Sequence, residues 1–367
     1  PLGALAVLAG IVLVHESGHY LAARAFNISV EEFSIGFGPK ILGFEKFGNE
    51  FNLRALPLGG YVRFPENFDI LDYSENFEIE YSDDPQLLQN RPWQERAVVL
   101  SGGVIFNLLL AFGIYFGEIG PLGGSGLPRA VFDDGVIVAQ SPRSGGPSDG
   151  ALLKGDIITG INGGQKQVSD FISTIRDTPD GEIATTTTTS SKPVSTTKTV
   201  SIQPQRNDGS TQTIGVSLRP NLEKVERLKS NNPIVAFKLA FEYLLDIFTQ
   251  TLLGTVSVLA SFISPSGSAP GQKISGPIGL IQQGSSVVAT KDWTAVWMFA
   301  AGLSVNLGVL NALPLPALDG GQLAFVIAEA ISGKKVDQKF QEGLTSVAVL
   351  FLLWLSVSAA VGDVSGL

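Results

Sequence analysis

An apolar segment at the start of the chain is long enough to cross a lipid bilayer, and it contains the only two histidines of the 367-residue sequence. It covers residues 1–26, and a helix needs about 20 apolar residues to span the hydrocarbon core. His15 and His19 lie inside it. Ionisable side chains at that depth are costly and usually functional. The segment therefore predicts a membrane-spanning helix that carries a reactive site.

The spacing of the histidines predicts that they bind one metal ion. Four residues is just over one helical turn, so the imidazoles of His15 and His19 project from the same helix face. Glu16 follows the first histidine, where it can take a proton from a water on the metal. The alternative is a buried helix in which both histidines are simply hydrogen-bonded, and the adjacent glutamate makes this the weaker interpretation.

Asp319 is the predicted third ligand. It follows two prolines that break a helix and precedes two glycines that let the backbone approach closely. The sequence has no cysteine, so any metal is bound by nitrogen and oxygen atoms. Two histidines, one carboxylate and a water are the open arrangement of a catalytic zinc, and we expect one zinc ion per chain. The alternative is an aspartate that caps a helix restarting at Gly320.

The order of apolar and polar segments divides the chain into three parts. A first membrane part (1–117) precedes a soluble insert (118–232), and a second membrane part (233–367) follows. About four helical spans are expected, at residues 1–26, 97–117, 293–331 and 344–361. The chain is 44% apolar and 16% charged, which suits a membrane protein, and its net charge of −9 argues against nucleic acid as a partner.

Residues 234–263 have a helical pattern but carry charged residues in their first half. This pattern favours an amphipathic helix on the membrane surface over a further span. With four spans, residues 27–96 lie on one side of the membrane and the insert lies on the other. The chain begins at Pro1 without an initiator methionine, so we expect a targeting segment to precede it.

Two regions outside the spans have strand patterns. Residues 33–64 alternate apolar and polar positions between glycines, which predicts short strands and hairpins. The insert is predicted to contain strands and one short helix, at residues 136–138, 150–164, 171–176 (the helix), 199–202 and 213–218. This order resembles a PDZ domain, an α+β fold. A Thr/Ser-rich stretch at 185–199 is predicted to be a loop.

Five motifs occur in an order that resembles the site-2 protease family, and the likeness covers nearly the whole chain. The motifs are HESGH at 15–19, GFGP at 36–39, PLGGYV at 57–62, SGPIG at 275–279 and NALPLPALDGG at 311–321. The PDZ-like insert lies between the second and third spans, as in the bacterial and plastid branch of that family. Two departures are Ser17, where the family more often has a bulky residue, and a single PDZ unit where some relatives have two.

The resemblance implies a zinc-dependent endopeptidase that cuts membrane-anchored proteins in or near their transmembrane segments. His15, His19 and Asp319 would bind zinc, and Glu16 would be the catalytic base. The tract 33–64 would be a membrane-associated β-hairpin region that pairs with an unwound strand of the substrate. The predicted substrate-binding residues are Asn311, which would hold the substrate backbone, and Asn107, Gly59 and Gly60.

Two other functions are compatible with parts of the sequence. One is a non-catalytic subunit of a membrane complex that retains the protease fold, and the other is an adaptor whose PDZ domain binds protein C-termini. The intact set of catalytic residues favours the enzyme over both. The Thr-rich stretch and the acidic polar parts favour a plastid envelope or thylakoid membrane over a bacterial plasma membrane.

Overall fold

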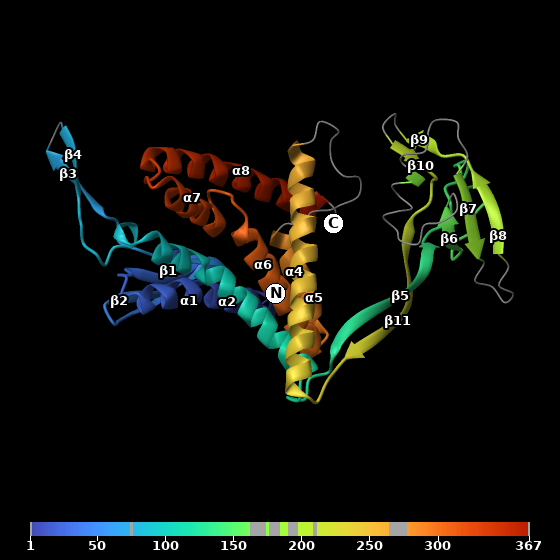
Figure 1. Cartoon of the computed structure of the whole chain (residues 1–367), viewed down its shortest axis with the longest axis horizontal. Helices are drawn as coiled ribbons and strands as arrows, with labels where there is room; N and C mark the ends of the chain where they lie inside the picture. Colours follow the sequence, from blue (N-terminus) through green and yellow to red (C-terminus); the bar gives the residue numbers. More distant parts are fainter. Residues whose placement is uncertain are drawn as a thin grey trace. The chain divides into compact units, whose positions relative to one another are not determined.

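The computed structural model describes residues 2–73, 76–161, 174–175, 184–189, 197–207, 211–263 and 277–365 (Figure 1). The chain divides into two compact units. The first contains Pro1–Gly126 and Lys229–Leu367, and the second contains Leu127–Leu228. The two predicted membrane parts therefore contribute to one unit, and the core of the predicted insert forms the other.

The first unit is mainly helical. Its helices are α1 (Leu2–Ala25), α2 (Trp93–Ile119), α4 (Pro233–Ile263), α5 (Pro277–Ala289), α6 (Trp293–Ala312), α7 (Asp319–Ser332) and α8 (Gln338–Ser365), with a short 3₁₀ helix η1 (Leu88–Asn90) before α2. Among the described residues, five helices are long and apolar enough to cross a membrane, namely α1, α2, α4, α6 and α8.

The helices differ from the sequence prediction in two places. The expected span at 293–331 is two helices, because Pro314 and Pro316 interrupt the helical pattern between α6 and α7. Helix α4, predicted to lie on the membrane surface, meets the length and composition of a span. The number of helices that cross the membrane, about four or five, therefore remains a prediction.

Helices α1 and α2 pack against each other through glycines. A Cβ on Gly102 would lie 2.5 Å from the carbonyl oxygen of Gly18, and a Cβ on Gly18 would overlap the carbonyl of Gly102. Only residues without a side chain allow two helix backbones to approach this closely. The contact brings the α1 face that carries the histidines directly against α2.

The strands predicted in residues 33–64 are present as β1 (Glu32–Lys46) and β2 (Asn49–Arg63). Residues 32–35 pair with 60–63 on one side and with 50–53 on the other, and residues 42–46 pair with 49–53. The segments therefore lie side by side in the order 60–63, 32–35, 50–53, 42–46. Residues 32–35 are inside the sheet, and residues 60–63 form one edge. A separate hairpin follows, formed by β3 (Phe68–Tyr73) and β4 (Asn76–Tyr81).

The described strands of the second unit form a sheet in the order β11-β5-β6-β7-β8. They are β5 (Leu127–Val138), β6 (Ile157–Ile161), β7 (Ala184–Thr189), β8 (Thr197–Ile202) and β11 (Leu218–Leu228), and β9 (Gln205–Asn207) pairs with β10 (Thr211–Thr213). Seven buried aliphatic side chains form its core: Val136, Val138, Leu152, Ile158, Ile175, Ile202 and Ile214.

Two predictions for this unit were wrong. The Thr-rich stretch at 185–199 is not a loop throughout, because most of it belongs to β7 and β8, which pair in register; β-branched threonines suit strands. The closing strand expected at 213–218 is absent, since β10 ends at Thr213 and β11 begins at Leu218. Of the short helix predicted at 171–176, only residues 174–175 are described, and they are helical. The rest lies outside the described residues.

Candidate metal centre

The structure brings the three predicted ligands together. The Nε2 atoms of His15 and His19 are 3.4 Å apart, and each lies 3.2 Å from Oδ2 of Asp319. With zinc–ligand bonds of about 2.0–2.1 Å, the ligand atoms of a tetrahedral site are about 3.3 Å from one another. The two histidines are buried, and Asp319 is partly exposed. The spacing therefore fits a zinc ion.

The hydrogen bonds around these atoms also fit a cation. Nδ1 of His19 is 2.8 Å from the carbonyl oxygen of Val99, which can only accept, so Nδ1 is the protonated nitrogen of a neutral His19 and Nε2 is an acceptor. That Nε2 faces the carboxylate of Asp319, another acceptor. Among the described residues, Oδ2 of Asp319 is buried and accepts no hydrogen bond. Acceptors that converge in this way require a positive centre between them.

A tight turn places Asp319 at the start of α7. The carbonyl oxygen of Ala312 lies 2.5 Å from where a Cβ on Gly320 would be, and Cα of Pro316 lies 2.5 Å from a Cβ on Gly321. The two glycines therefore allow the chain to fold back against the end of α6. The hydroxyl of Thr345 on α8 donates to the carbonyl oxygen of Pro316 at 3.3 Å and braces the same turn.

Of the two glycines predicted to bind substrate, Gly60 lies against Glu16, the predicted catalytic base. Glu16 is buried on α1 between the two histidines. A Cβ on Gly60 would lie 2.9 Å from Cγ of Glu16, so the β2 backbone contacts this side chain directly. A Cβ on Gly59 would lie 2.9 Å from Cζ of Phe37. The edge segment 60–63 thus passes immediately beside Glu16.

The two predicted asparagines both contact His15. Nδ2 of Asn311, at the end of α6, lies 3.4 Å from Nε2 of His15, on the side of the proposed metal. Nδ2 of Asn107, on α2, lies 3.0 Å from Nδ1 of the same ring, on the side away from the proposed metal. Asn107 is 0% exposed. It has no surface that a substrate could touch in this conformation, unlike Asn311.

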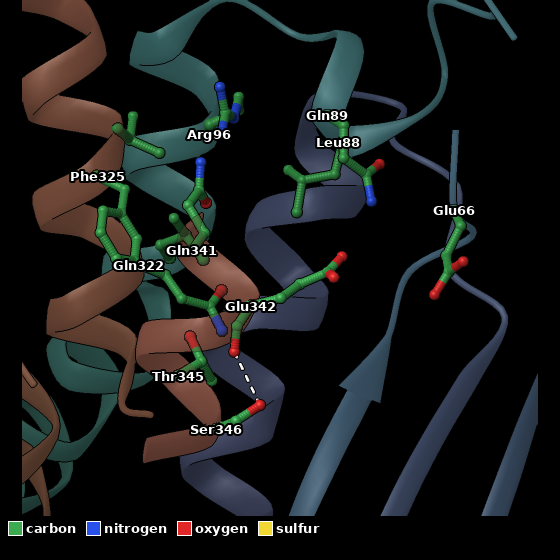
Figure 2. A pocket seen from close by; sticks show the side chains of 12 residues that line it. Glu66, Leu88, Gln89, Arg96, Gln322, Phe325, Gln341, Glu342, Thr345 and Ser346 are labelled. Atoms are coloured by element: carbon green, nitrogen blue, oxygen red, sulfur yellow. Dashed lines mark hydrogen bonds between the residues drawn. The ribbon is translucent and has the colours of Figure 1, made fainter. Parts of the chain in front are cut away.

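A pocket of about 540 Å³ in the helical unit is lined by both polar and apolar side chains (Figure 2). It is lined by residues of α2, α7, α8 and the segments before α2, including Glu66, Gln89, Arg96, Leu100, Gln322 and Glu342. Leu100 follows the residue that binds His19, and Gln322 is one turn beyond Asp319. On its wall Nη1 of Arg96 is 2.6 Å from Oε2 of Glu329, and this buried ion pair joins α2 to α7.

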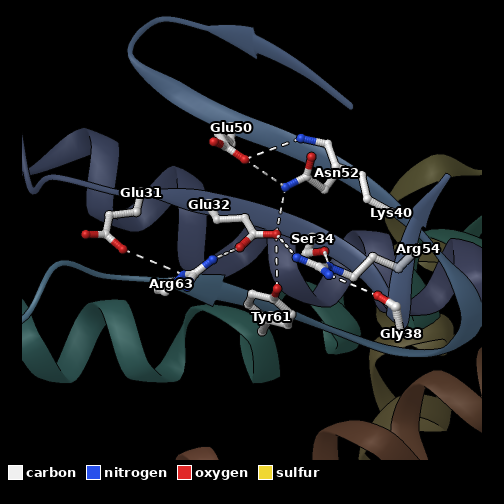
Figure 3. Close-up of polar contacts among 10 residues, drawn as sticks. All are labelled: Glu31, Glu32, Ser34, Gly38, Lys40, Glu50, Asn52, Arg54, Tyr61 and Arg63. Atoms are coloured by element: carbon white, nitrogen blue, oxygen red, sulfur yellow. Dashed lines mark hydrogen bonds and ion pairs between the residues drawn. The ribbon is translucent and has the colours of Figure 1, made fainter. Parts of the chain in front are cut away.

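A second polar cluster, centred on Glu32, crosslinks the β1–β2 sheet (Figure 3). The carboxylate is 2% exposed. It accepts hydrogen bonds from Asn52 at 2.7 Å, Arg54 at 2.6 Å and Tyr61 at 3.0 Å, and it pairs with Arg63. Tyr61 and Arg63 belong to the edge segment 60–63, whereas Asn52 and Arg54 lie beyond Glu32 on the other side. One buried carboxylate therefore holds three strand segments in register.

The sequence predicted neither Val99 nor Glu32, and it did not place Gly103 at the histidines. Val99 acts through its backbone carbonyl, which no side-chain pattern reports. Gly103 lies under both imidazoles, where a Cβ would come 2.5 Å from Cε1 of His15, and the pair Gly102-Gly103 in an apolar helix was its only signal. Glu32 could have been noticed as an acidic residue at the start of an apolar alternating tract.

Three candidate metal ligands beside a glutamate, in a unit whose helices are long and apolar enough to cross a membrane, fit a membrane metallopeptidase. The family model for peptidase family M50 matches residues 3–355, and the chain belongs to this family. This finding confirms the resemblance to the site-2 proteases. Zinc as the metal and protease as the class follow from the family and from the names of its members.

The most informative relatives are photosynthetic. A protein of Synechocystis sp., named "Putative zinc metalloprotease", is 33% identical over 370 residues, covering 99% of this chain and 93% of its own. The Arabidopsis thaliana "Membrane metalloprotease ARASP, chloroplastic" is 33% identical over 369 residues, covering 99% of this chain and 78% of its own. Among solved structures, the PDZ domain of an SdrC-like protein from Listeria monocytogenes is 26% identical, covers 24% of this chain and 93% of its own, and has a TM-score of 0.22.

Proposed function

We propose that this chain is an intramembrane endopeptidase that binds one zinc ion through His15, His19 and Asp319. The observation that carries the proposal is the convergence of three ligand atoms at 3.2–3.4 Å, next to a buried glutamate, in a unit built of apolar helices. Zinc bound there would polarise the scissile carbonyl and make a water molecule more acidic.

The residues around the site supply the proton transfer and the binding of the substrate backbone. Glu16 accepts the proton of the attacking water and delivers it to the leaving amide nitrogen. Its burial against the backbone at Gly60 fixes the position of its carboxylate relative to any peptide that lies along β2. Asn311, beside Nε2 of His15, donates an amide hydrogen to the substrate backbone.

The edge segment 60–63 binds the substrate as an added strand. A helical substrate hides its carbonyls in internal hydrogen bonds, so it must unwind before it can be cut. Among the described residues, 60–63 pair with 32–35 alone, which leaves one edge of this segment for an extended peptide. Because Gly60 contacts Glu16, a peptide added to this edge lies next to the base.

The substrates are membrane-anchored proteins, and the enzyme works in the bilayer, alone or in a membrane complex. The PDZ-like insert has no metal-ligand set among its described residues, and it acts on the choice of substrate rather than in the chemistry. A plastid envelope or thylakoid membrane is the proposed location, supported by the chloroplastic name of the Arabidopsis relative. Fractionation of plastid envelope and thylakoid membranes, with detection of this protein by an antibody, tests that location.

Cleavage of a single-span model protein by the purified, reconstituted chain tests the function. Glu16→Gln should retain zinc and lose cleavage, because the amide cannot accept a proton. His19→Ala should lose both. Glu223→Gln, an exposed glutamate of β11, serves as the control and should change neither. Cleavage that survives in Glu16→Gln would remove its role as base, and a zinc-loaded wild-type chain that cuts no membrane protein would favour the non-catalytic subunit or the PDZ adaptor.

A further inference from the structure

Three residues of α2, spaced four apart, face the two histidines. The carbonyl oxygen of Val99 lies 2.8 Å from Nδ1 of His19, and the Asn107 amide lies 3.0 Å from Nδ1 of His15. Between them, Gly103 leaves the space that the imidazoles occupy. Because both sets of residues repeat every four positions, one face of α2 matches the histidine face of α1 residue by residue.

The hydrogen bonds of His15 require an acceptor at its Nδ1. Its Nε2 points toward Asp319 and His19, at 3.2 and 3.4 Å. A nitrogen that binds a metal donates its lone pair to the metal and carries no hydrogen. The other nitrogen of the neutral ring therefore carries the hydrogen. The group next to Nδ1 must therefore accept a hydrogen bond, as the carbonyl of Val99 does for His19.

The Asn107 amide can meet this requirement in one of its two orientations. With Nδ2 toward His15, two nitrogens face each other, and Oδ1 is buried without a hydrogen-bond partner among the described residues. A half-turn of the amide exchanges the two atoms, which the hydrogen-bond network alone distinguishes. Oδ1 then accepts from Nδ1–H of His15, and the buried oxygen has a partner.

We propose that Asn107 is a positioning residue of the metal site: its amide oxygen accepts the Nδ1–H of His15 and holds this ring in the tautomer whose Nε2 faces the metal. This replaces the substrate-binding role that the sequence suggested, since the side chain is fully buried. Ser304 of α6 donates to the Asn107 backbone carbonyl at 2.9 Å and fixes that turn of α2. The inference rests on the proposed metal site.

Zinc affinity tests the proposal with two substitutions of nearly equal size. Asn107→Leu removes the acceptor, and loss of such a partner lowers metal affinity by about 10–100-fold. Asn107→Asp keeps an acceptor and should bind zinc nearly as tightly as the wild type. Affinity is measured by competition with a chelator on the full chain in detergent. Ser101→Ala, on an exposed turn of the same helix, is the control and should bind as the wild type does.

The tautomer itself can be observed, because the chain has only two histidines. In zinc-loaded wild-type protein labelled with ¹⁵N-histidine, both rings should show a protonated Nδ1 and a metal-bound Nε2. An unprotonated Nδ1 on His15 overturns the proposal, whether or not any variant folds. Equal affinity in Asn107→Leu and wild type, or equal loss in Asn107→Leu and Asn107→Asp, also overturns it. A wild-type chain that binds no zinc refutes the metal site instead.

Discussion

A single missing side chain at Gly103 makes room for both imidazoles. A Cβ there would lie 2.5 Å from Cε1 of His15 and would also overlap Nε2 of His19. Overpacking a closed site costs about 1–3 kcal/mol, so Gly103→Ala should lower zinc affinity about tenfold or more. Gly113→Ala, on the same helix, is the matched control, because a Cβ at Gly113 would point into open space. Metal analysis measures both, and a Gly103→Ala chain with the zinc affinity of the wild type would contradict the geometry.

The site residues that could be predicted from the sequence are those marked by their immediate neighbours in the chain. His15 and Glu16 belong to one helical turn, and the prolines and glycines next to Asp319 predict a break in the helix and a tight turn. The residues that support them are not local. Glu32 binds Arg63, 31 positions away, and Val99 contributes a carbonyl that every residue possesses. Such contacts depend on the packing of distant segments, so a sequence pattern could mark Glu32 as unusual but could not identify its partners.

At the scale of elements, the pair Arg96–Glu329 holds α2 and α7 together. The first helix supports the histidines and the second begins at Asp319, so their spacing sets the distances between the ligands. Glu329 also accepts from the backbone of Val336 at 3.2 Å. Removing one partner of a buried pair costs about 3–5 kcal/mol, so Glu329→Gln should lower both Tm and zinc affinity.

An exposed pair on another helix provides the comparison for this prediction. Lys238 and Glu242 of α4 are 3.7 Å apart and largely exposed, and exposed pairs contribute about 0–1 kcal/mol. Glu242→Gln should therefore leave Tm nearly unchanged. The double variant Arg96→Met/Glu329→Leu should recover much of the lost stability, because apolar side chains of similar size can replace a buried pair. Equal Tm values for Glu329→Gln and Glu242→Gln would show that the α2–α7 pair does not hold the helices.

The edge segment 60–63 depends on Glu32. Glu32→Gln removes the negative charge that pairs with both Arg54 and Arg63. Loss of one partner of a fully buried pair lowers the free energy of unfolding by about 3–5 kcal/mol, and the loss here should be smaller because Arg63 is 55% exposed. We expect a higher KM with zinc content unchanged, because the edge proposed to bind the substrate is loosened while the proposed metal ligands stay in place. Glu45→Gln, exposed on the same strand, is the control. A Glu32→Gln enzyme with the KM of the wild type would separate this cluster from substrate binding.

At the scale of the whole molecule, the sequence predicted the helical segments better than the sheets. Long apolar stretches define α1, α2 and α8 without knowledge of their neighbours. Strand β7 was missed because a run of threonines has no apolar alternation and its pairing is set by the partner strand, whereas most of β8 was predicted, at residues 199–202. Helix α4 carries charged residues and also has enough apolar residues for a span. Its composition therefore fits both a helix on the membrane surface and a membrane-spanning helix, and its packing against other helices decides between them.

The second unit can be deleted cleanly, because its first and last residues lie next to each other. Leu127 and Leu228 are paired at the start of β5 and the end of β11, and paired residues lie about 4.5–5.5 Å apart. A short Gly/Ser linker can therefore join Gly126 to Lys229 without strain on the helical unit. The truncated chain should keep its zinc, because the ligands and their supporting residues all belong to the first unit.

Deletion of residues 127–228 then tests whether the PDZ-like unit selects substrates. If it excludes proteins with a bulky extramembrane domain, the truncated enzyme should cut both an intact single-span substrate and one whose soluble domain has been trimmed, whereas the wild type cuts the trimmed form preferentially. The ratio of kcat/KM for the two substrates measures this selectivity and should approach one. A Tm and a zinc content like those of the wild type are the controls for folding. Loss of cleavage for both substrates in a folded, zinc-loaded truncated chain would instead mean that the unit delivers the substrate to the site.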